Sequence, residues 1–221
     1  MLKQAWEIFR KDLASELRTR YALNALLMFV VVTLAVIMFS LVGETLPAGA
    51  QTGMLWVVMF FAAMSGLSRS FVAEEERGTT MTLQLLASPM AVYLGKLLFN
   101  LLLVLVLNAF IVAMYLLTME QFFVRQPGLF WLVMLLGGIG MASATTIIAA
   151  IIAKANTKGT LFPVLAFPIL LPLLMAGISA TKLAVEDSSW SAVWPDLQLL
   201  GSYIVVVTTV SFLLFDFVWK D

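Results

Sequence analysis

The side chains best suited to polar chemistry lie together in one segment, residues 73–96. An acidic cluster comes first, and clustered carboxylates can pair with basic residues on a partner protein, where they mainly set register and encounter rate. Gly78 follows and permits a sharp turn or a close approach of the backbone. Thr79 or Thr80 can then cap a new helix. The three acidic residues are Glu74, Glu75 and Glu76.

The helix that this pattern predicts is short and amphipathic. We expect Pro89 to end it or kink it, because proline lacks a backbone donor and restricts the residue before it. A short helix of this kind suits insertion into a groove on a partner protein. It equally suits a position at a membrane surface, where it contacts only lipid and its own neighbours. Its apolar side chains are Met81, Leu83, Leu85 and Leu86, and the three leucines are the candidates to enter a groove.

The composition removes most kinds of catalytic chemistry. The chain has no His and no Cys, so it lacks the commonest general base, the commonest haem ligand and every thiolate site. It also lacks a Gly-x-x-x-x-Gly-Lys-Ser/Thr phosphate loop, so any ATP hydrolysis must occur on another chain. The formal net charge is zero, which gives no indication of a nucleic-acid partner. We expect no catalytic residue and no metal site.

The polar segment 73–96 lies between apolar blocks that are long enough to span a membrane. Of the 221 residues, 62% are hydrophobic and only 12% are charged, against about 25% charged residues in an average soluble chain. A bilayer core needs about 20 apolar residues as helix, and only helices satisfy their own backbone in lipid. The sequence predicts an all-α integral membrane protein with a single domain, 1–221. Its six predicted spans are 22–42, 53–72, 97–119, 129–153, 160–179 and 199–219.

The distribution of Lys and Arg predicts that both termini are cytoplasmic. With the N-terminus inside, only Arg125 and Lys182 remain outside. Ala48 to Ala50 resembles a cleavage site, but the apolar block before it is too long for a signal core, so we expect no cleavage. The predicted inside residues are Lys3, Arg10, Lys11, Arg18, Arg20, Arg69, Arg77, Lys96, Lys154, Lys158 and Lys220.

Residues 2–20 predict an amphipathic helix ahead of the first span. Its apolar residues recur at steps of three and four, which suits a helix lying in the headgroup layer. The alternative is a solvated helical lead-in, and Trp6 and Phe9 on the apolar face favour the interfacial version. The residues of this face are Leu2, Ala5, Trp6, Phe9, Leu13 and Leu17.

Polar residues and prolines inside the spans have two interpretations. Asn100 and Asn108 lie near one face of the third span, where they either bond across helices or line a substrate path. The fourth span is rich in Gly and Ala and permits close helix approach. The fifth span should bend at its prolines, either as a static kink or as a bend that shifts with nucleotide state. These prolines are Pro163, Pro168 and Pro172.

The segment after the second span also resembles a known family. Acidic residues, then Arg77-Gly78-Thr79, Leu83-Gln84-Leu85-Leu86-Ala87-Ser88-Pro89 and Gly95-Lys96 are similar to the first cytoplasmic loop of type-2 ABC transporter permeases. Within that superfamily the chain resembles the CcmB family, haem exporter protein B. The start Phe9-Arg10-Lys11-Asp12-Leu13, the proline-rich fifth span and the compact length carry this closer resemblance.

The resemblance implies a permease subunit of the bacterial inner membrane that acts in cytochrome c maturation, by haem export or by ATP-driven release of a haem chaperone. It implies that residues 74–89 contact CcmA-like ATP-binding subunits, which hold the ATP. A second copy of the chain, or CcmC- and CcmD-like membrane proteins, would complete the complex. We expect no bound cofactor and no haem ligation by this chain. The alternatives are a type-2 ABC permease for a lipid, glycan or drug, and an intramembrane enzyme.

Overall fold

A computed structural model describes residues 1–153 and 158–220. All regular structure within these ranges is helical. Most of the predicted connection 154–159, including Lys154, lies outside the described residues. The helices are α1 (Leu2–Thr19), α2 (Tyr21–Ser40), α3 (Ala48–Leu67), α4 (Arg69–Glu76), α5 (Thr80–Leu86), α6 (Pro89–Thr118), α7 (Pro127–Ala153), α8 (Lys158–Val185) and α9 (Trp190–Lys220).

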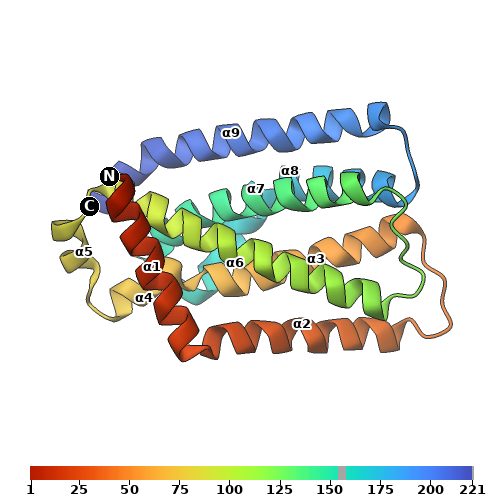
Figure 1. Ribbon diagram of the computed structural model, residues 1–221, viewed down its shortest axis with the longest axis horizontal. Helices are drawn as coiled ribbons and strands as arrows, with labels where there is room; N and C mark the ends of the chain where they lie inside the picture. Colours follow the sequence, from red (N-terminus) through yellow and green to blue (C-terminus); the bar gives the residue numbers. More distant parts are fainter. Residues whose placement is uncertain (154–157, 221) are drawn as a thin grey trace.

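The six long helices α2, α3, α6, α7, α8 and α9 run along one axis of the molecule (Figure 1). Within the described residues, six segments are long and apolar enough to cross a membrane, as the sequence predicts. Both chain termini, α1, α4 and α5 lie at one end of the bundle, which we call the α5 end. The α2–α3, α6–α7 and α8–α9 connections lie at the other end, which we call the opposite end.

The predicted span boundaries differ from the observed ones at both ends of the bundle, and the fifth span ends at Val185 instead of residue 179. The second span begins earlier, at Ala48, and α4 continues its helical direction to Glu76. The third begins at Pro89 instead of residue 97, and the sixth begins at Trp190 instead of residue 199. Hydropathy marks only the apolar part of a helix, so polar turns at its ends are missed. Most of the predicted loop 73–96 is therefore helical.

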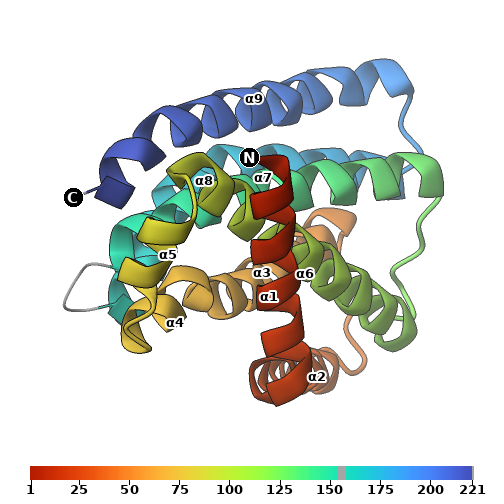
Figure 2. The same ribbon diagram turned by 60° about the vertical axis from the view of Figure 1, so that its left-hand side comes forward.

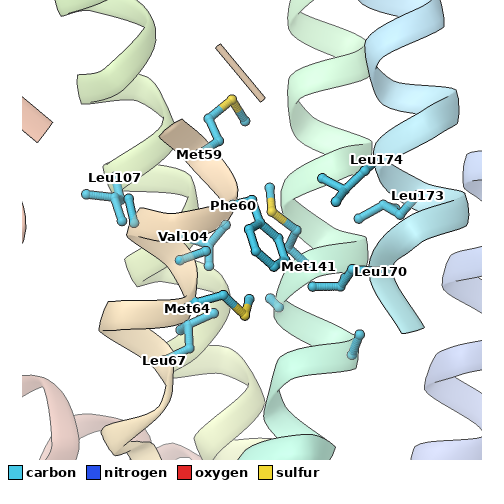
Figure 3. Close-up of a cluster of buried hydrophobic side chains, with 14 of the residues drawn as sticks. Met59, Phe60, Met64, Leu67, Val104, Leu107, Met141, Leu170, Leu173 and Leu174 are labelled. Atoms are coloured by element: carbon cyan, nitrogen blue, oxygen red, sulfur yellow. The ribbon is translucent and has the colours of Figure 1, made fainter. Parts of the chain in front are cut away.

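Helix α7 forms the centre of the bundle, and 78% of its membrane window is buried by other helices. This confirms the close approach predicted from its small residues. A Cβ built on Gly137 would lie 2.3 Å from the ring of Trp56, and one built on Gly140 would lie 2.4 Å from Leu173. Figure 3 shows the neighbouring core, where apolar side chains of α3, α6, α7 and α8 meet.

Trp56 of α3 joins three helices. Its indole occupies the space that a side chain at Gly137 of α7 or Gly177 of α8 would need, because a Cβ at either position would lie within 2.4 Å of the ring. Its Nε1 donates a hydrogen bond of 2.9 Å to the hydroxyl of Thr181 on α8. The indole is fully buried. By contrast, only 17% of the membrane window is buried in α2 and in α9, so these helices present most of their apolar surface outward.

Candidate functional site

The polar segment folds as two short helices joined by a tight turn. Helix α4 ends at Glu76, and Gly78 adopts φ +66°, a left-handed conformation that favours glycine. The backbone N–H of Thr79 donates back to the carbonyl of Glu74 at 3.0 Å. These features confirm the predicted turn at Gly78.

Helix α5 differs in detail from its prediction. Thr79 takes the N-cap position, but its hydroxyl makes no capping bond and instead donates to Glu74 Oε2 at 2.5 Å. The helix ends at Leu86, and Pro89 begins the next helix, α6. The helix therefore stops before Pro89, as expected, but Pro89 does not kink it and instead begins the next helix. Proline suits the first turn of a helix because the N–H it lacks would have no partner there.

The apolar side chains of α5 point in two directions. Met81, Leu85 and Leu86 are 73%, 83% and 71% exposed. Leu83 is partly buried and packs against the hydrophobic core. The structure therefore places Leu85 and Leu86, together with Met81, on the free face of α5. Leu83 instead attaches the helix to its own bundle, contrary to its predicted place in a partner's groove.

Two hydrogen bonds fix α5 to helices far away in the sequence. The side-chain amide of Gln84 donates to the carbonyl of Trp219 on α9 at 2.7 Å. The side-chain amide of Gln4 on α1 donates to the carbonyl of Leu86 at 3.3 Å. Arg77, in the turn before α5, donates to the hydroxyl of Ser15 on α1 at 3.4 Å. Helix α5 is thus connected to both ends of the chain.

A group of charges, buried except for Lys11, lies where α1, α4 and α6 meet. Lys96 Nζ lies 2.9 Å from Asp12 Oδ2 and 2.9 Å from Glu74 Oε1, and its side chain is 2% exposed. It also donates to the carbonyl of Ser70 at 2.8 Å. Lys11 pairs with Glu74 and lies 3.2 Å from Asp12 Oδ1. We call the four charged residues Lys11, Asp12, Glu74 and Lys96 the ion cluster.

The ion cluster changes the role expected for Glu74. Its side chain is about nine-tenths buried and is paired with Lys11 and Lys96 of the same chain, so it does not face a partner. Glu75, Glu76 and Arg77 remain exposed. Sequence reasoning missed the cluster, although a lysine just inside a long apolar helix is a signal, because such a charge needs a counter-ion.

Lys11 carries its charge throughout the neutral range. Burial by itself lowers the pKa of Lys11, but the hydrogen bond to Glu74 and the charges of Asp12 and Glu74 outweigh burial and raise it above the usual 10.5. A lysine pKa raised by folding stabilises the folded state below the unfolded pKa, and the effect is lost as pH rises through the folded pKa. The contribution of Lys11 therefore persists at neutral pH and disappears in strong alkali.

Helix α1 lies across the α5 end of the bundle and packs on α6 (Figure 2). A Cβ on Gly95 would lie 2.7 Å from the carbonyl of Ala5, so the two helices are in close contact. Of the predicted interfacial face, Ala5 is buried, Phe9 and Leu13 are partly buried, and Leu2, Trp6 and Leu17 are exposed. The rings of Trp6 and Phe9 stack with centroids 5.0 Å apart.

A comparison with protein-family models shows the family to which the chain belongs. The family model for CcmB protein matches residues 3–217 of this chain. The chain belongs to the CcmB family. Comparison with individual curated proteins gave no match.

Family membership makes the chain a membrane permease component of the ABC-type haem exporter of cytochrome c maturation. It also implies association with an ABC ATPase and with other membrane proteins of that system. Six spans agree with a multi-pass membrane protein. In the described part of the chain, no group of three or more Asp or Glu side chains is placed to hold a metal ion.

The intramembrane polar residues of this CcmB-family chain lie away from α5. Asn100 donates to the hydroxyl of Thr146 on α7 at 2.9 Å, which is the predicted bond across helices. Among the residues that the structure describes, the buried amide of Asn108 has no hydrogen-bond partner. Thr208 on α9 donates to Ser143 on α7 at 3.3 Å. These contacts join α6, α7 and α9.

The three prolines lie inside α8, which remains one helix from Lys158 to Val185. Pro163, Pro168 and Pro172 each remove a backbone donor, which weakens the helix around them. The hydroxyl of Tyr203 on α9 donates to the carbonyl of Ile169, next to Pro168, at 3.0 Å. A neighbouring helix therefore supports the proline-rich part of α8.

Proposed function

We propose that residues 74–89 of this permease bind an ATP-binding subunit and transmit its motion to the membrane helices. The carrying observation is the exposed apolar face of α5, formed by Met81, Leu85 and Leu86 at the end of the bundle that holds both termini. A helix that lays such a face into a groove is a common mode of protein recognition. The chain has no phosphate loop of its own, so the ATP must be on the partner.

The attachments of α5 give the motion a route into the bundle. A displacement of α5 acts on α9 through Gln84, on α1 through Gln4 and on α4 through the Gly78 turn. The ion cluster then links α4 to α1 and α6. Glu75 and Glu76, which are exposed, are available to pair with basic residues of the partner and set its register.

The test is Leu85→Asp combined with Leu86→Asp. Each buried leucine contributes about 1.5–3 kcal/mol, so the pair should weaken docking by about two powers of ten or more. The control is Phe123→Asp, which changes an equally exposed apolar side chain, 73% exposed, at the opposite end. The parent and both variants should insert normally, and copurification from mild detergent should lose the ATP-binding subunit only in the double variant.

Retention of the partner and of full ATPase activity in the double variant would remove the basis for docking through α5. Leu83→Asp serves as a separate comparison, because Leu83 packs on the core. It should lower the stability of the chain itself, which a thermal unfolding measurement in detergent detects without the partner.

We also propose that the α5 end is cytoplasmic and that the membrane is the bacterial inner membrane. Of the described cationic residues, Arg125 and Lys182 lie toward the opposite end, whereas the rest lie toward the α5 end. Positive charge accumulates on the cytoplasmic side of membrane proteins. Two ATP-binding subunits would then bind two copies of this chain, or one copy beside a CcmC-like permease with its CcmD-like companion.

The chain should act without ligating haem iron itself. It has no His and no Cys, so only Met and Tyr side chains remain as axial ligands. Purified alone and incubated with haem, it should show no stoichiometric Soret band. A band that disappears on a single Met or Tyr substitution would contradict this proposal. The proposed role, in haem export or in release of a haem chaperone, would then include direct haem binding.

A further inference from the structure

A second polar feature adjoins the ion cluster; Glu74 and Arg77 of the segment 74–89 contribute to it, but the exposed apolar face of α5 does not. It is a pocket of about 280 Å³ between α1, the start of α2, the α3–α4 junction and α6. Its lining includes polar side chains, among them Ser15, Arg69 and Arg77, and apolar ones, among them Leu26, Phe99 and Leu103. The pocket therefore matches a ligand with a polar and an apolar part.

The pocket lining carries three acidic and three basic side chains, and Lys11, which pairs with two of the acids from outside the lining, adds one further positive charge. Asp12 and Glu74 are balanced by Lys11 and Lys96 within the ion cluster. The remaining charged groups of the lining are the two arginines and Glu16. The Glu16 carboxylate already accepts the backbone N–H of Leu23 at 3.0 Å, at the start of α2. Guanidinium groups favour phosphate, which they bind in a planar, bidentate manner.

The position of the pocket indicates that its ligand has an apolar tail. Leu26 and Leu103 belong to membrane-spanning segments, whereas Arg77 follows the last residue of α4. Helix α1, which lies across the α5 end of the bundle (Figure 2), contributes Asp12, Ser15 and Glu16 to the lining. With the six apolar segments placed across a bilayer, the pocket would extend from the level of the lipid headgroups into the hydrocarbon layer. A free phosphate would pair with the two arginines but would leave the apolar side chains of the lining without a contact.

We propose that this pocket binds one phospholipid from the leaflet at the α5 end. Its phosphate contacts Arg69 and Arg77, and the first part of an acyl chain lies against Leu26, Phe99 and Leu103. The bound lipid fills the space between α1 and α4 beside the ion cluster. The proposal requires that the chain spans a membrane, but it does not depend on which protein docks on α5.

The experiment uses the complete complex, purified in mild detergent or in nanodiscs of phosphatidylglycerol and phosphatidylethanolamine. Native mass spectrometry counts the phospholipids retained by each copy of the chain. Arg69→Gln with Arg77→Gln should lower retention of one phospholipid by about tenfold or more, because charge-assisted bonds are the strong ones. The control is Arg10→Gln with Arg18→Gln, which removes two exposed arginines of α1 outside the pocket. The control should retain the lipid.

Two further arms separate the lipid from a free anion. Arg69→Gln alone leaves the segment 74–89 intact and should still reduce retention, so a docking defect cannot account for the loss. Glycerol phosphate, which lacks acyl chains, and inorganic phosphate should fail to displace the lipid at millimolar concentration. Equal retention by the double variant and its control would overturn the proposal. Displacement of the lipid by inorganic phosphate would also overturn it and assign the pocket to a soluble anion.

Discussion

The two ends of the bundle use charge differently. At the α5 end, Lys96 is buried with Asp12 and Glu74 within 2.9 Å of its amine. At the opposite end, Lys182 and Glu186 are 3.9 Å apart and both side chains are more than 40% exposed. A buried ion is costly unless paired, whereas an exposed pair contributes little. The ion pairs at the α5 end therefore join separate helices, whereas the exposed pair at the opposite end joins residues only four positions apart.

The connections show the same contrast. At the opposite end, short segments link the long helices, with bonds such as Gln121 Nε2 to the carbonyl of Glu44 at 3.0 Å. At the α5 end, the corresponding connection is folded into α4 and α5 and is bonded to α1 and α9. An element that must transmit force needs such attachments. The difference agrees with the proposal that a partner binds at the α5 end.

The largest effect should come from removing the buried cation. Lys96→Met leaves Glu74 and Asp12 with only Lys11, and breaking a buried pair in this way costs about 3–5 kcal/mol. Lys182→Met, which breaks the exposed pair, should cost less than about 1 kcal/mol. Titration with sodium dodecyl sulfate in mixed micelles measures both free energies of unfolding.

A rescue variant sharpens this test. Lys96→Met with Glu74→Met should recover part of the loss, because Lys11 lies 3.2 Å from Asp12 and can pair with it. If the two lysine variants were equally stable, the contrast between the two ends would be incorrect.

The next effect concerns two glycines with similar backbones. Gly78 and Gly43 have φ of +66° and +83°, and a Cβ at either would meet no atom within 4 Å. Valine at either position should therefore add backbone strain of about 1–2 kcal/mol without a clash. Only Gly78→Val should abolish stimulated ATPase activity of the complex, because only that turn directs α5. Equal loss of activity in Gly43→Val would show that strain alone is responsible.

A smaller effect is expected from the two aromatic residues of α1. Trp6→Glu with Phe9→Glu should loosen α1 from the membrane surface, at a cost of about 3 kcal/mol or more of apolar contact. The chain has no Cys, so Leu2→Cys provides a unique label for a water-soluble maleimide. Labelling should be slow in the parent and faster in the double variant.

The control for this experiment is Ala14→Glu, which adds a carboxylate at an exposed position of the same helix without removing an aromatic ring. Its labelling rate at residue 2 should match that of the parent. Fast labelling of the parent itself would mean that α1 is solvated.

The mildest substitutions test the sidedness of the two ends. Ser189→Cys and Glu76→Cys both replace exposed side chains, at the opposite end and the α5 end respectively. In intact cells, a membrane-impermeant maleimide should label residue 189 and leave residue 76 unlabelled, with activity little changed. Labelling of residue 76 from outside would reverse the proposed orientation.

The spans were predictable because each is an apolar block long enough to cross a bilayer. The polar turns at their ends were not predictable from hydropathy. The helix through Glu74, for example, is held by a pair with Lys96, which lies 22 residues further along the chain. The pairing also involves α1, and no local pattern reveals which distant helix supplies the counter-ion. Family resemblance correctly indicated the permease component, yet it could not show that Glu74 faces inward.

The sequence also could not show which side chains of α5 face the core and which are exposed. A helix of seven residues is too short for its apolar residues to define one direction. The Gly78 turn and the bond from Gln84 to Trp219 set the rotation of the helix. That rotation places Leu83 against the core and leaves Leu85 exposed. The division of the leucines therefore depends on tertiary contacts.

Trp56 also decides which parts of the membrane region can move during a transport cycle. Sliding α8 past α3 would force the indole out of the spaces at Gly137 and Gly177 and break its bond to Thr181. Close-packed interiors do not deform continuously, so α3, α7 and α8 should move little relative to one another and act as one rigid unit. The outer helices α2 and α9 have little of their surface buried, so we expect them to move more than these three helices when a partner displaces α5.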